Sequence, residues 1–165
     1  MQHVQIRSTT SALVLTAVLI ALATLFTMYT KIPVPGIRGY FNVGDVVIMT
    51  SALLLGRKYG AYIGAIGPAL ADLFLGYAVF VPITFVVKGI EGYLVGTVYN
   101  NKTTTSALAA TIVGGIIIVA GYFIVEYFVF NPGVAIASIL TNAIQAVMSV
   151  IVSIILYAIL RKRLG

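Results

Sequence analysis

Long uncharged runs of apolar residues, separated by short polar connections, occupy most of this 165-residue sequence. A run of about 20 apolar residues has the length of one helical crossing of a lipid bilayer. Only 8% of the residues are charged and 61% are hydrophobic, whereas a water-soluble domain carries about 25% charged residues. Intrinsic disorder is excluded as well, because it requires low hydrophobicity and high net charge. The sequence therefore predicts an integral membrane protein.

The apolar runs number six, and their residues are apolar at consecutive positions rather than alternating as in a membrane β-barrel. We expect an all-α bundle of six transmembrane helices in one membrane domain that covers residues 1–165. The expected helices are approximately 10–29, 43–55, 59–75, 83–99, 106–130 and 134–160.

The basic residues predict which way the bundle lies in the membrane, because cytoplasmic connections carry the excess of Lys and Arg. With six spans, the side that holds both termini carries seven basic residues: Arg7, Arg57, Lys58, Lys102, Arg161, Lys162 and Arg163. The other side carries two, Lys31 and Arg38. We therefore expect cytoplasmic termini and the multi-pass plasma membrane of a prokaryote. The net charge of +6 is then explained by topology, and no nucleic-acid partner is expected.

The sequence lacks the residues that a metal site, a nucleotide-binding site or an enzyme active site would require. The chain has no cysteine and one histidine, His3 in the polar N-terminal segment, so we expect no metal site and no cofactor. The phosphate-binding signature G-x-x-x-x-G-K-[ST] is missing, so an ATP-driven process would need the ATPase of another chain. The four carboxylates are dispersed over different helices without an Asp/His cluster, and we expect no enzyme.

Charged residues inside the apolar runs are the clearest sign of function. Each costs at least about 2.5–3.5 kcal/mol near the bilayer centre and must face protein or a wet cavity. At about 1.5 Å of rise per residue, they and nearby amides fall in the outer halves of the spans. The group comprises Asp45, Asp72, Lys88, Glu91, Glu126, Asn142 and Gln145. We expect an outward-opening cavity that binds a small polar molecule.

These residues also have structural interpretations. Lys88 and Glu91, three residues apart on one helical face, either neutralise each other or contact the ligand. Asp45 is expected to cap the second helix, and Asp72 to pair with a cation such as Lys88. Glu126 has ligand contact and interfacial solvation as equal alternatives.

Two alternatives also stay open for the amide side chains of the sixth helix and for the first connection. Asn142 and Gln145 either join helices by hydrogen bonds or bind the ligand. The connection from Thr30 to Asn42, with Pro33 and Pro35, either dips into the bundle as a re-entrant segment or leads into a merely tilted short helix.

Three segments together resemble the substrate-binding S components of energy-coupling factor (ECF) transporters, of the riboflavin and hydroxymethylpyrimidine types. They are GYFNVGD at 39–45, GPALADL at 67–73 and KGIEG at 88–92. The resemblance implies a vitamin-binding membrane subunit that docks on a transmembrane coupling subunit driven by two cytoplasmic ATPases. It implies that Ala17 and Ala21 form part of the docking face. It nominates as ligand-binding residues Tyr40, Asn42, Lys88, Glu91, Tyr122, Glu126, Asn142 and Gln145.

We therefore expect an S component of an ECF importer that captures a small water-soluble vitamin or precursor from outside. Hydroxymethylpyrimidine, pyridoxine and a riboflavin-like molecule are the candidates, because aromatic faces and amides suit a heteroaromatic ring. The alternative is a stand-alone ion-coupled carrier of small molecules, in which Lys88 and Glu91 titrate during transport.

Overall fold

A computed structural model describes residues 9–30, 32–33, 40–99 and 103–164 of the chain. It confirms the all-α fold of six helices. The helices are α1 (Thr9–Tyr29), α2 (Gly44–Leu55), α3 (Arg57–Phe74), α4 (Phe80–Val98), α5 (Thr104–Val129) and α6 (Pro132–Leu164). Every helix begins and ends within four residues of its expected bounds.

Two very short strands, which the sequence did not predict, lie between α1 and α2. Strand β1 (Ile32–Pro33) pairs antiparallel with β2 (Tyr40–Phe41), with Ile32 opposite Phe41 and Pro33 opposite Tyr40. The pairing brings the two sides of the first connection together before the chain enters α2.

Helix lengths differ in a way that matters for a membrane. Helices α1, α4, α5 and α6 are long and apolar enough to cross a bilayer. Helix α3 carries Arg57, Lys58 and Asp72 and is less apolar. Helix α2 has 12 residues and so extends only about 18 Å, against a hydrocarbon core of about 30 Å. One end of α2 must therefore lie inside the bundle.

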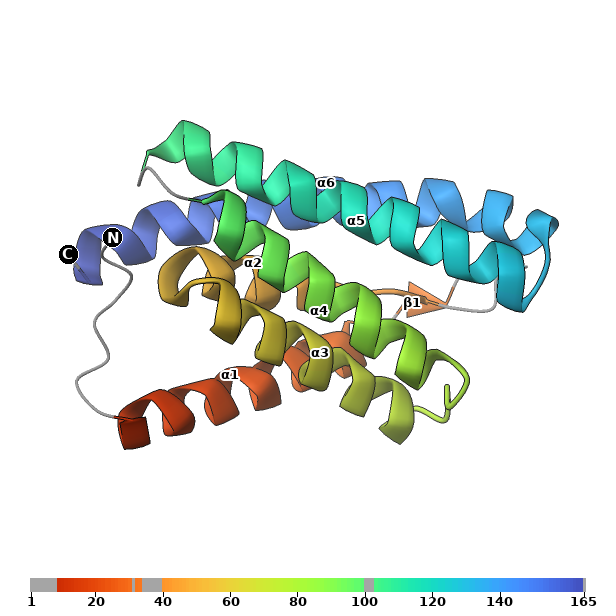
Figure 1. Ribbon diagram of the computed structural model, residues 1–165, viewed down its shortest axis with the longest axis horizontal. Coiled ribbons are helices and arrows are strands. Elements are labelled where there is room, and N and C mark those ends of the chain that lie inside the picture. The colour runs from red at the N-terminus through yellow and green to blue at the C-terminus, as the bar shows by residue number, and fades with distance from the viewer. Residues whose placement is uncertain (1–8, 31, 34–39, 100–102, 165) are drawn as a thin grey trace.

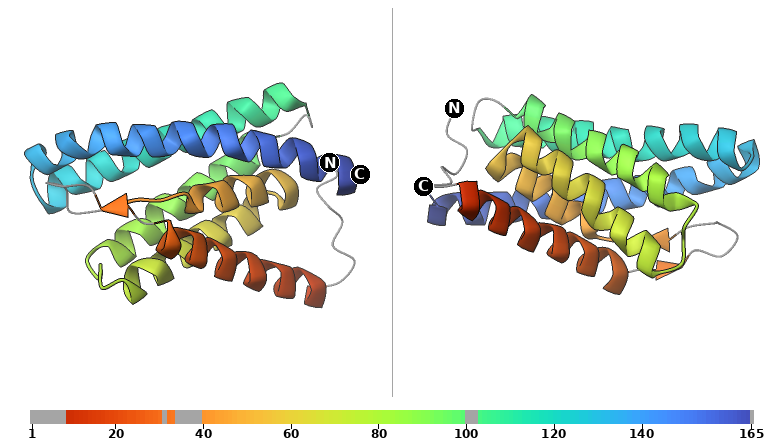
Figure 2. Two further views of the ribbon diagram at one scale, coloured as in Figure 1. Left: turned by 180° about the vertical axis from the view of Figure 1, so that it is seen from behind. Right: turned by 60° about the horizontal axis from the view of Figure 1, so that its bottom comes forward.

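Helix ends gather at two opposite ends of the molecule (Figure 1). The start of α1, the junction of α2 with α3, the end of α4 and the end of α6 share one end, which we call the terminal end. The β1–β2 pair and the α3–α4 and α5–α6 turns lie at the other, which we call the hairpin end. The views in Figure 2 show the same arrangement from behind and from below.

Glycines allow α3 and α4 to pack backbone against backbone. A Cβ added at Gly64 would lie 2.2 Å from the carbonyl oxygen of Lys88, and one added at Gly92 would lie 2.1 Å from that of Gly60. Because no side chain separates the two helices there, the close contact fixes the position of Lys88 relative to α3.

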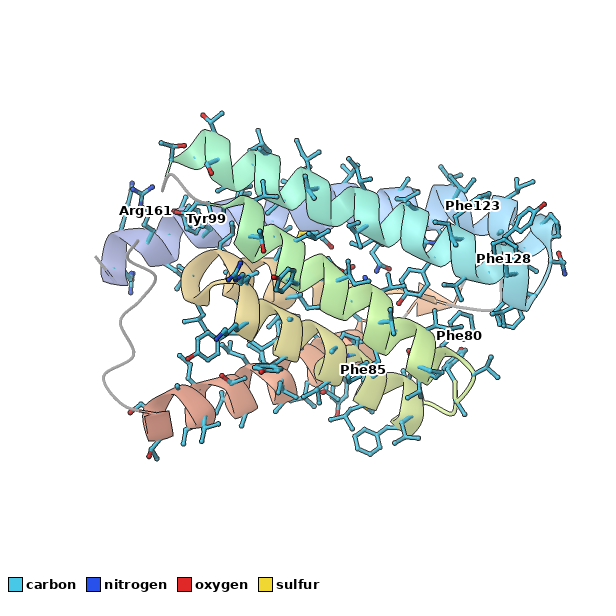
Figure 3. All side chains as sticks on the ribbon, in the orientation of Figure 1. Phe80, Phe85, Tyr99, Phe123, Phe128 and Arg161 are labelled. Carbon is cyan, nitrogen blue, oxygen red and sulfur yellow. The ribbon has the colours of Figure 1, made fainter. Side chains whose placement is uncertain are left out.

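The interior is apolar toward the terminal end, and the outside is apolar almost everywhere. Met49, Leu53, Val95 and Ile118 form one buried cluster between α2, α4 and α5. Large apolar side chains also project outward, as Figure 3 shows for Phe85 and Phe128, and Phe128 is 80% exposed. Such a surface is stable in lipid and not in water.

Candidate functional site

A cavity of about 50 Å³ lies within the bundle, between the ion-paired centre of α4 and the hairpin end. Side chains from α1, α3, α4, α5 and α6, from the α3–α4 turn and from the segment before α2 line it. They are Thr27, Asn42, Pro68, Asp72, Tyr77, Phe80, Thr84, Lys88, Tyr122, Glu126, Ser138, Thr141, Asn142 and Gln145. Most of these groups are polar, although the surrounding helices are built largely of apolar residues.

One wall of the cavity is formed by a buried ion cluster centred on Lys88. The ammonium Nζ lies 2.6 Å from Oδ1 of Asp45 and 3.2 Å from Oε2 of Glu91. All three side chains are buried, with exposed fractions of 1%, 0% and 0% in the order Lys88, Asp45, Glu91. A single ammonium therefore serves two carboxylates, and the cluster carries a formal charge of −1.

Gln145 joins this cluster to the first connection. Its Nε2 donates to Oδ2 of Asp45 over 2.7 Å, and its Oε1 accepts a hydrogen bond of 3.0 Å from the backbone N–H of Asn42. The Asn42 side chain in turn accepts from the backbone N–H of Gly44 over 2.8 Å. Gln145 lies 13 residues into α6, about 20 Å from its start. The chain therefore reaches well into the bundle at Asn42, which supports the re-entrant alternative.

Two further carboxylates line the cavity. Glu126 on α5 is 3% exposed and accepts a hydrogen bond from the hydroxyl of Ser138 on α6. Asp72, near the end of α3, is 4% exposed and lines the same cavity. With the ion cluster, all four carboxylates of the chain lie in or directly behind the cavity wall.

Aromatic rings complete the lining toward the hairpin end. The Tyr122 hydroxyl is 3.1 Å from the hydroxyl of Thr84, and the Tyr122 ring centroid lies 5.4 Å from Nζ of Lys88. Tyr77 packs edge-on against Phe80, with ring centroids 6.4 Å apart. A planar ligand would meet ring faces or edges here and charged groups deeper in the cavity.

Asn142 differs from the other amide of α6. Its Nδ2 is buried in the cavity wall and has no hydrogen-bond partner within the described part of the chain. A buried amide donor without a partner is costly, so this group is available to a ligand.

Six of the eight nominated ligand-binding residues line the cavity: Asn42, Lys88, Tyr122, Glu126, Asn142 and Gln145. Glu91 lies behind Lys88 and does not reach the cavity surface. Tyr40 contributes backbone pairing through β2, and its side chain lies outside the described residues. Ligand contact by these residues stays a prediction.

One structural expectation is wrong. Asp45 does not cap α2, because the N-cap is Val43 and no side chain bonds there; its carboxylate is held by Lys88 and Gln145 instead. Lys88 is not the partner of Asp72, because its salt bridges reach Asp45 and Glu91; the expected pairing of Asp72 with a cation stays a prediction.

The sequence reasoning did not nominate Phe80, Thr84 or Ser138 as site residues. Phe80 and Thr84 precede Lys88 by eight and four residues on α4, and Ser138 precedes Asn142 by four on α6. Because residues four apart share a helical face, following the faces of Lys88 and Asn142 back by one or two turns would have reached all three.

The remaining expectations concern metals and docking. Among the described residues, no group of three or more His, Asp or Glu side chains is placed to hold a metal ion. Ala17 and Ala21 are both exposed on α1, with Val14 and Leu25 on the same side of the helix.

Comparison with known proteins gives a consistent result. Residues 7–162 match the family model of the ECF-type riboflavin transporter S component. An uncharacterized protein of Pyrococcus woesei is 41% identical over 145 residues, which cover 86% of this chain and 96% of that protein. The thiamine precursor transporter HmpT of Lactococcus lactis is 29% identical, with 98% of this chain and 92% of that protein covered.

A solved structure has the same fold. It is described as the S component of a bacterial ECF transporter, with a TM-score of 0.74 and 21% sequence identity. The match covers 96% of this chain and 99% of that one, so the bundle is shared over its whole length.

Proposed function

The chain belongs to the family of ECF-type riboflavin transporter S components, and from that premise we propose which substrate it captures and how it is coupled. It is a membrane transport protein of the vitamin-uptake class. We propose that it binds a small, single-ring vitamin or vitamin precursor from outside the cell and delivers it through an ATP-driven ECF importer. The observation that carries the proposal is the cavity, which gathers the carboxylates of an otherwise apolar bundle around one small space.

The size of the cavity favours a single ring. A water molecule needs about 10–15 Å³ of such space, so about 50 Å³ holds only a few waters. A pyrimidine or pyridine ring fits with small side-chain adjustments, whereas the three fused rings of a flavin require the helices to separate. The name of the HmpT relative, a thiamine precursor transporter, supports the smaller substrate.

The charge of the lining favours a ligand that donates hydrogen bonds. Asp72 and Glu126 present carboxylates, and the ammonium of Lys88 is already shared by Asp45 and Glu91. A ring with an amino group, or with a protonated ring nitrogen, would donate a charge-assisted hydrogen bond to a carboxylate of the lining. Hydroxymethylpyrimidine carries such an amino group, and the unpartnered Nδ2 of Asn142 would donate to a ring nitrogen.

We place the hairpin end at the outer face of the prokaryotic plasma membrane and the terminal end in the cytoplasm, following the distribution of Lys and Arg. The cavity then opens toward the side from which a substrate arrives. A transmembrane coupling subunit and two cytoplasmic ATPases would supply the energy, with Ala17 and Ala21 on the exposed face of α1 as part of the docking surface.

The test is to identify the small molecule that copurifies with the protein, by mass spectrometry of the denatured sample. Titration calorimetry in detergent then compares hydroxymethylpyrimidine, pyridoxine and riboflavin. We expect the aminopyrimidine to bind most tightly and Asp72→Asn or Glu126→Gln to weaken it. Preferential binding of riboflavin would contradict the single-ring substrate, and no binding of any vitamin would contradict the receptor function.

A stand-alone ion-coupled carrier is the second candidate, favoured by the buried cluster of Lys88, Asp45 and Glu91, since intramembrane ionisable groups often relay protons. Purified protein in liposomes distinguishes the two. The carrier accumulates substrate under a proton gradient by itself, and the S component does so only with the coupling subunit, the ATPases and ATP.

A further inference from the structure

The charged side chains of this protein are sorted by sign. All four carboxylates are buried, with exposed fractions of 0% for Asp45, 4% for Asp72, 0% for Glu91 and 3% for Glu126. By contrast, the exposed charged side chains in the described part of the chain are Arg57, Lys58, Arg161, Lys162 and Arg163. The described surface therefore carries positive charge only.

These five basic residues lie at one end of the molecule. Arg57 and Lys58 begin α3, and Arg161, Lys162 and Arg163 lie in the last turn of α6. The two groups are linked by the end of α4. A Cβ at Gly96 would lie 2.4 Å from the backbone nitrogen of Arg57, and Tyr99, one turn further, bonds through its hydroxyl to Tyr157, beneath Arg161.

Two of the arginines are held against aromatic rings. The guanidinium carbon of Arg161 lies 5.9 Å from the centroid of the buried Tyr157 ring, and that of Arg57 lies 5.7 Å from the Tyr93 ring. Figure 3 shows Arg161 beside Tyr99 at the terminal end. A guanidinium that is fixed in this way keeps its in-plane N–H donors for a planar or tetrahedral anion.

Within the described ranges of the chain, no carboxylate forms a salt bridge with these donors. The salt bridges found among the described residues both belong to Lys88. The carboxylate of α4 is also distant from this end of the molecule. Glu91 lies eight residues before Tyr99, which is about 12 Å along the helix axis. The basic groups are thus free to bind an anion from outside the chain.

We propose that Arg57, Lys58, Arg161, Lys162 and Arg163, the basic patch, bind the headgroups of anionic phospholipids at the terminal end of the bundle. The patch stands at the ends of two membrane-embedded helices, where headgroup phosphates lie. Basic residues next to a membrane span attract anionic lipids in this way, and arginine binds phosphate with paired hydrogen bonds. This inference does not depend on which substrate the cavity holds.

Native mass spectrometry of the full-length protein in detergent tests the proposal. The probes are phosphatidylglycerol and phosphatidylcholine with identical acyl chains. We expect the wild-type protein to retain phosphatidylglycerol at roughly tenfold lower lipid concentration than phosphatidylcholine, and to lose this preference in high salt, where exposed charges are screened.

The deciding variant is Arg161→Gln/Lys162→Gln/Arg163→Gln. Each basic residue near an anionic surface contributes about fivefold, so the loss of three is enough to remove the whole preference: affinity for phosphatidylglycerol falls by roughly tenfold, to that for phosphatidylcholine, which is unchanged. Arg161→Lys/Arg163→Lys keeps most of the preference. The matched control is Thr104→Gln/Thr105→Gln, at exposed neutral positions of the same end.

Equal retention of the two lipids by the wild-type protein would overturn the proposal, and so would an unchanged preference in the glutamine variant. If that variant keeps its preference and instead loses association with a coupling subunit, the basic patch is a protein interface and not a lipid site. Should the triple variant fail to fold, Arg57→Gln/Lys58→Gln on α3 provides the same measurement.

Discussion

Lys88 is the buried cation of the described chain, and its removal has a larger effect than the loss of one ligand contact. Lys88→Met leaves Asp45 and Glu91 buried without a positive partner. Removing one member of a buried ion pair costs about 3–5 kcal/mol of stability. We therefore expect Lys88→Met to lower the midpoint of thermal unfolding in detergent markedly and to abolish binding.

The compensated variant Asp45→Asn/Lys88→Met/Glu91→Gln distinguishes the effect of unpaired buried charge from the effect of lost packing around Lys88. It removes the ammonium and both carboxylates together, so no charge is left uncompensated, and most of the lost thermal stability returns. If the triple variant is as unstable as Lys88→Met, the instability comes from lost packing around the lysine side chain rather than from unpaired charge.

Asn142 and Gln145, one turn apart on α6, give opposite predictions. Nδ2 of Asn142 has no partner in the described chain, so Asn142→Leu removes nothing that the ligand-free protein uses and leaves its unfolding temperature unchanged or slightly higher. Its ligand affinity, measured by calorimetry, falls by roughly tenfold for one lost hydrogen bond of about 1.4 kcal/mol.

Gln145→Leu serves as the contrast. It removes the hydrogen bonds to Asp45 and to the backbone of Asn42, so it lowers the stability of the ligand-free protein. A lowered unfolding temperature in both variants would show that Asn142 has a structural partner and is not reserved for ligand.

The cost of burying charge let the sequence predict much of the site. Lys88, Glu126 and Asn142 stand out because each is polar in an apolar run, and all three line one cavity. The role of Asp45 could not be predicted, because its partner Gln145 is 100 residues away in sequence. The position of Asp45 in the first turn of the predicted helix indicated a cap, whereas its observed contacts depend on how deep the start of α2 lies in the bundle.

At the level of helices, α3 and α4 act as one rigid pair because of their glycines. Gly64→Ala places a methyl group 2.2 Å from the carbonyl oxygen of Lys88, and Gly92→Ala places one 2.1 Å from that of Gly60. Since the obstacles are backbone atoms, the helices must separate, at a typical cost of about 1–3 kcal/mol for overpacking. We expect a lower unfolding temperature and weaker ligand binding in both variants.

Gly89→Ala on the same helix is the matched control. Its added methyl would lie 3.2 Å from the Cβ of Ala65, a contact that small shifts relieve, so the unfolding temperature changes much less. Equal effects of Gly89→Ala and Gly92→Ala would mean that helix propensity, and not the close approach of α3 and α4, dominates.

Helix positions were largely predictable because apolar runs of sufficient length have few other structures open to them in a bilayer. The end of α6 was expected at 160 and lies at Leu164. Arg161, Lys162 and Arg163 follow the last apolar residue of the run, but basic residues are favourable at a helix C-terminus, and the helix continues through them. Strands β1 and β2 are too short to produce a pattern in the sequence.

For the molecule as a whole, the proposed orientation has a direct test, because the chain contains no cysteine. Lys58→Cys places a thiol on the exposed start of α3 at the terminal end, and Val79→Cys places one in the exposed turn at the hairpin end. With an impermeant maleimide applied to intact cells, we expect labelling at position 79 and protection at position 58. The reverse pattern would invert the bundle and point the cavity toward the cytoplasm.

The docking face predicted on α1 is the last prediction at this scale. Ala17 and Ala21 are exposed on a helix that packs inward against α2 and α3, and small residues at four-residue spacing let another helix approach closely. Ala17→Trp and Ala21→Trp each block that approach without touching the cavity. Since exposed substitutions change stability by only about 0.5 kcal/mol, vitamin affinity in detergent should stay within about twofold, while ATP-driven uptake and copurification of the coupling subunit are lost. Val18→Trp, 58% exposed and about 100° around the same helix, should leave uptake intact. Full uptake by both alanine variants would mean that the coupling subunit meets a different face of the bundle.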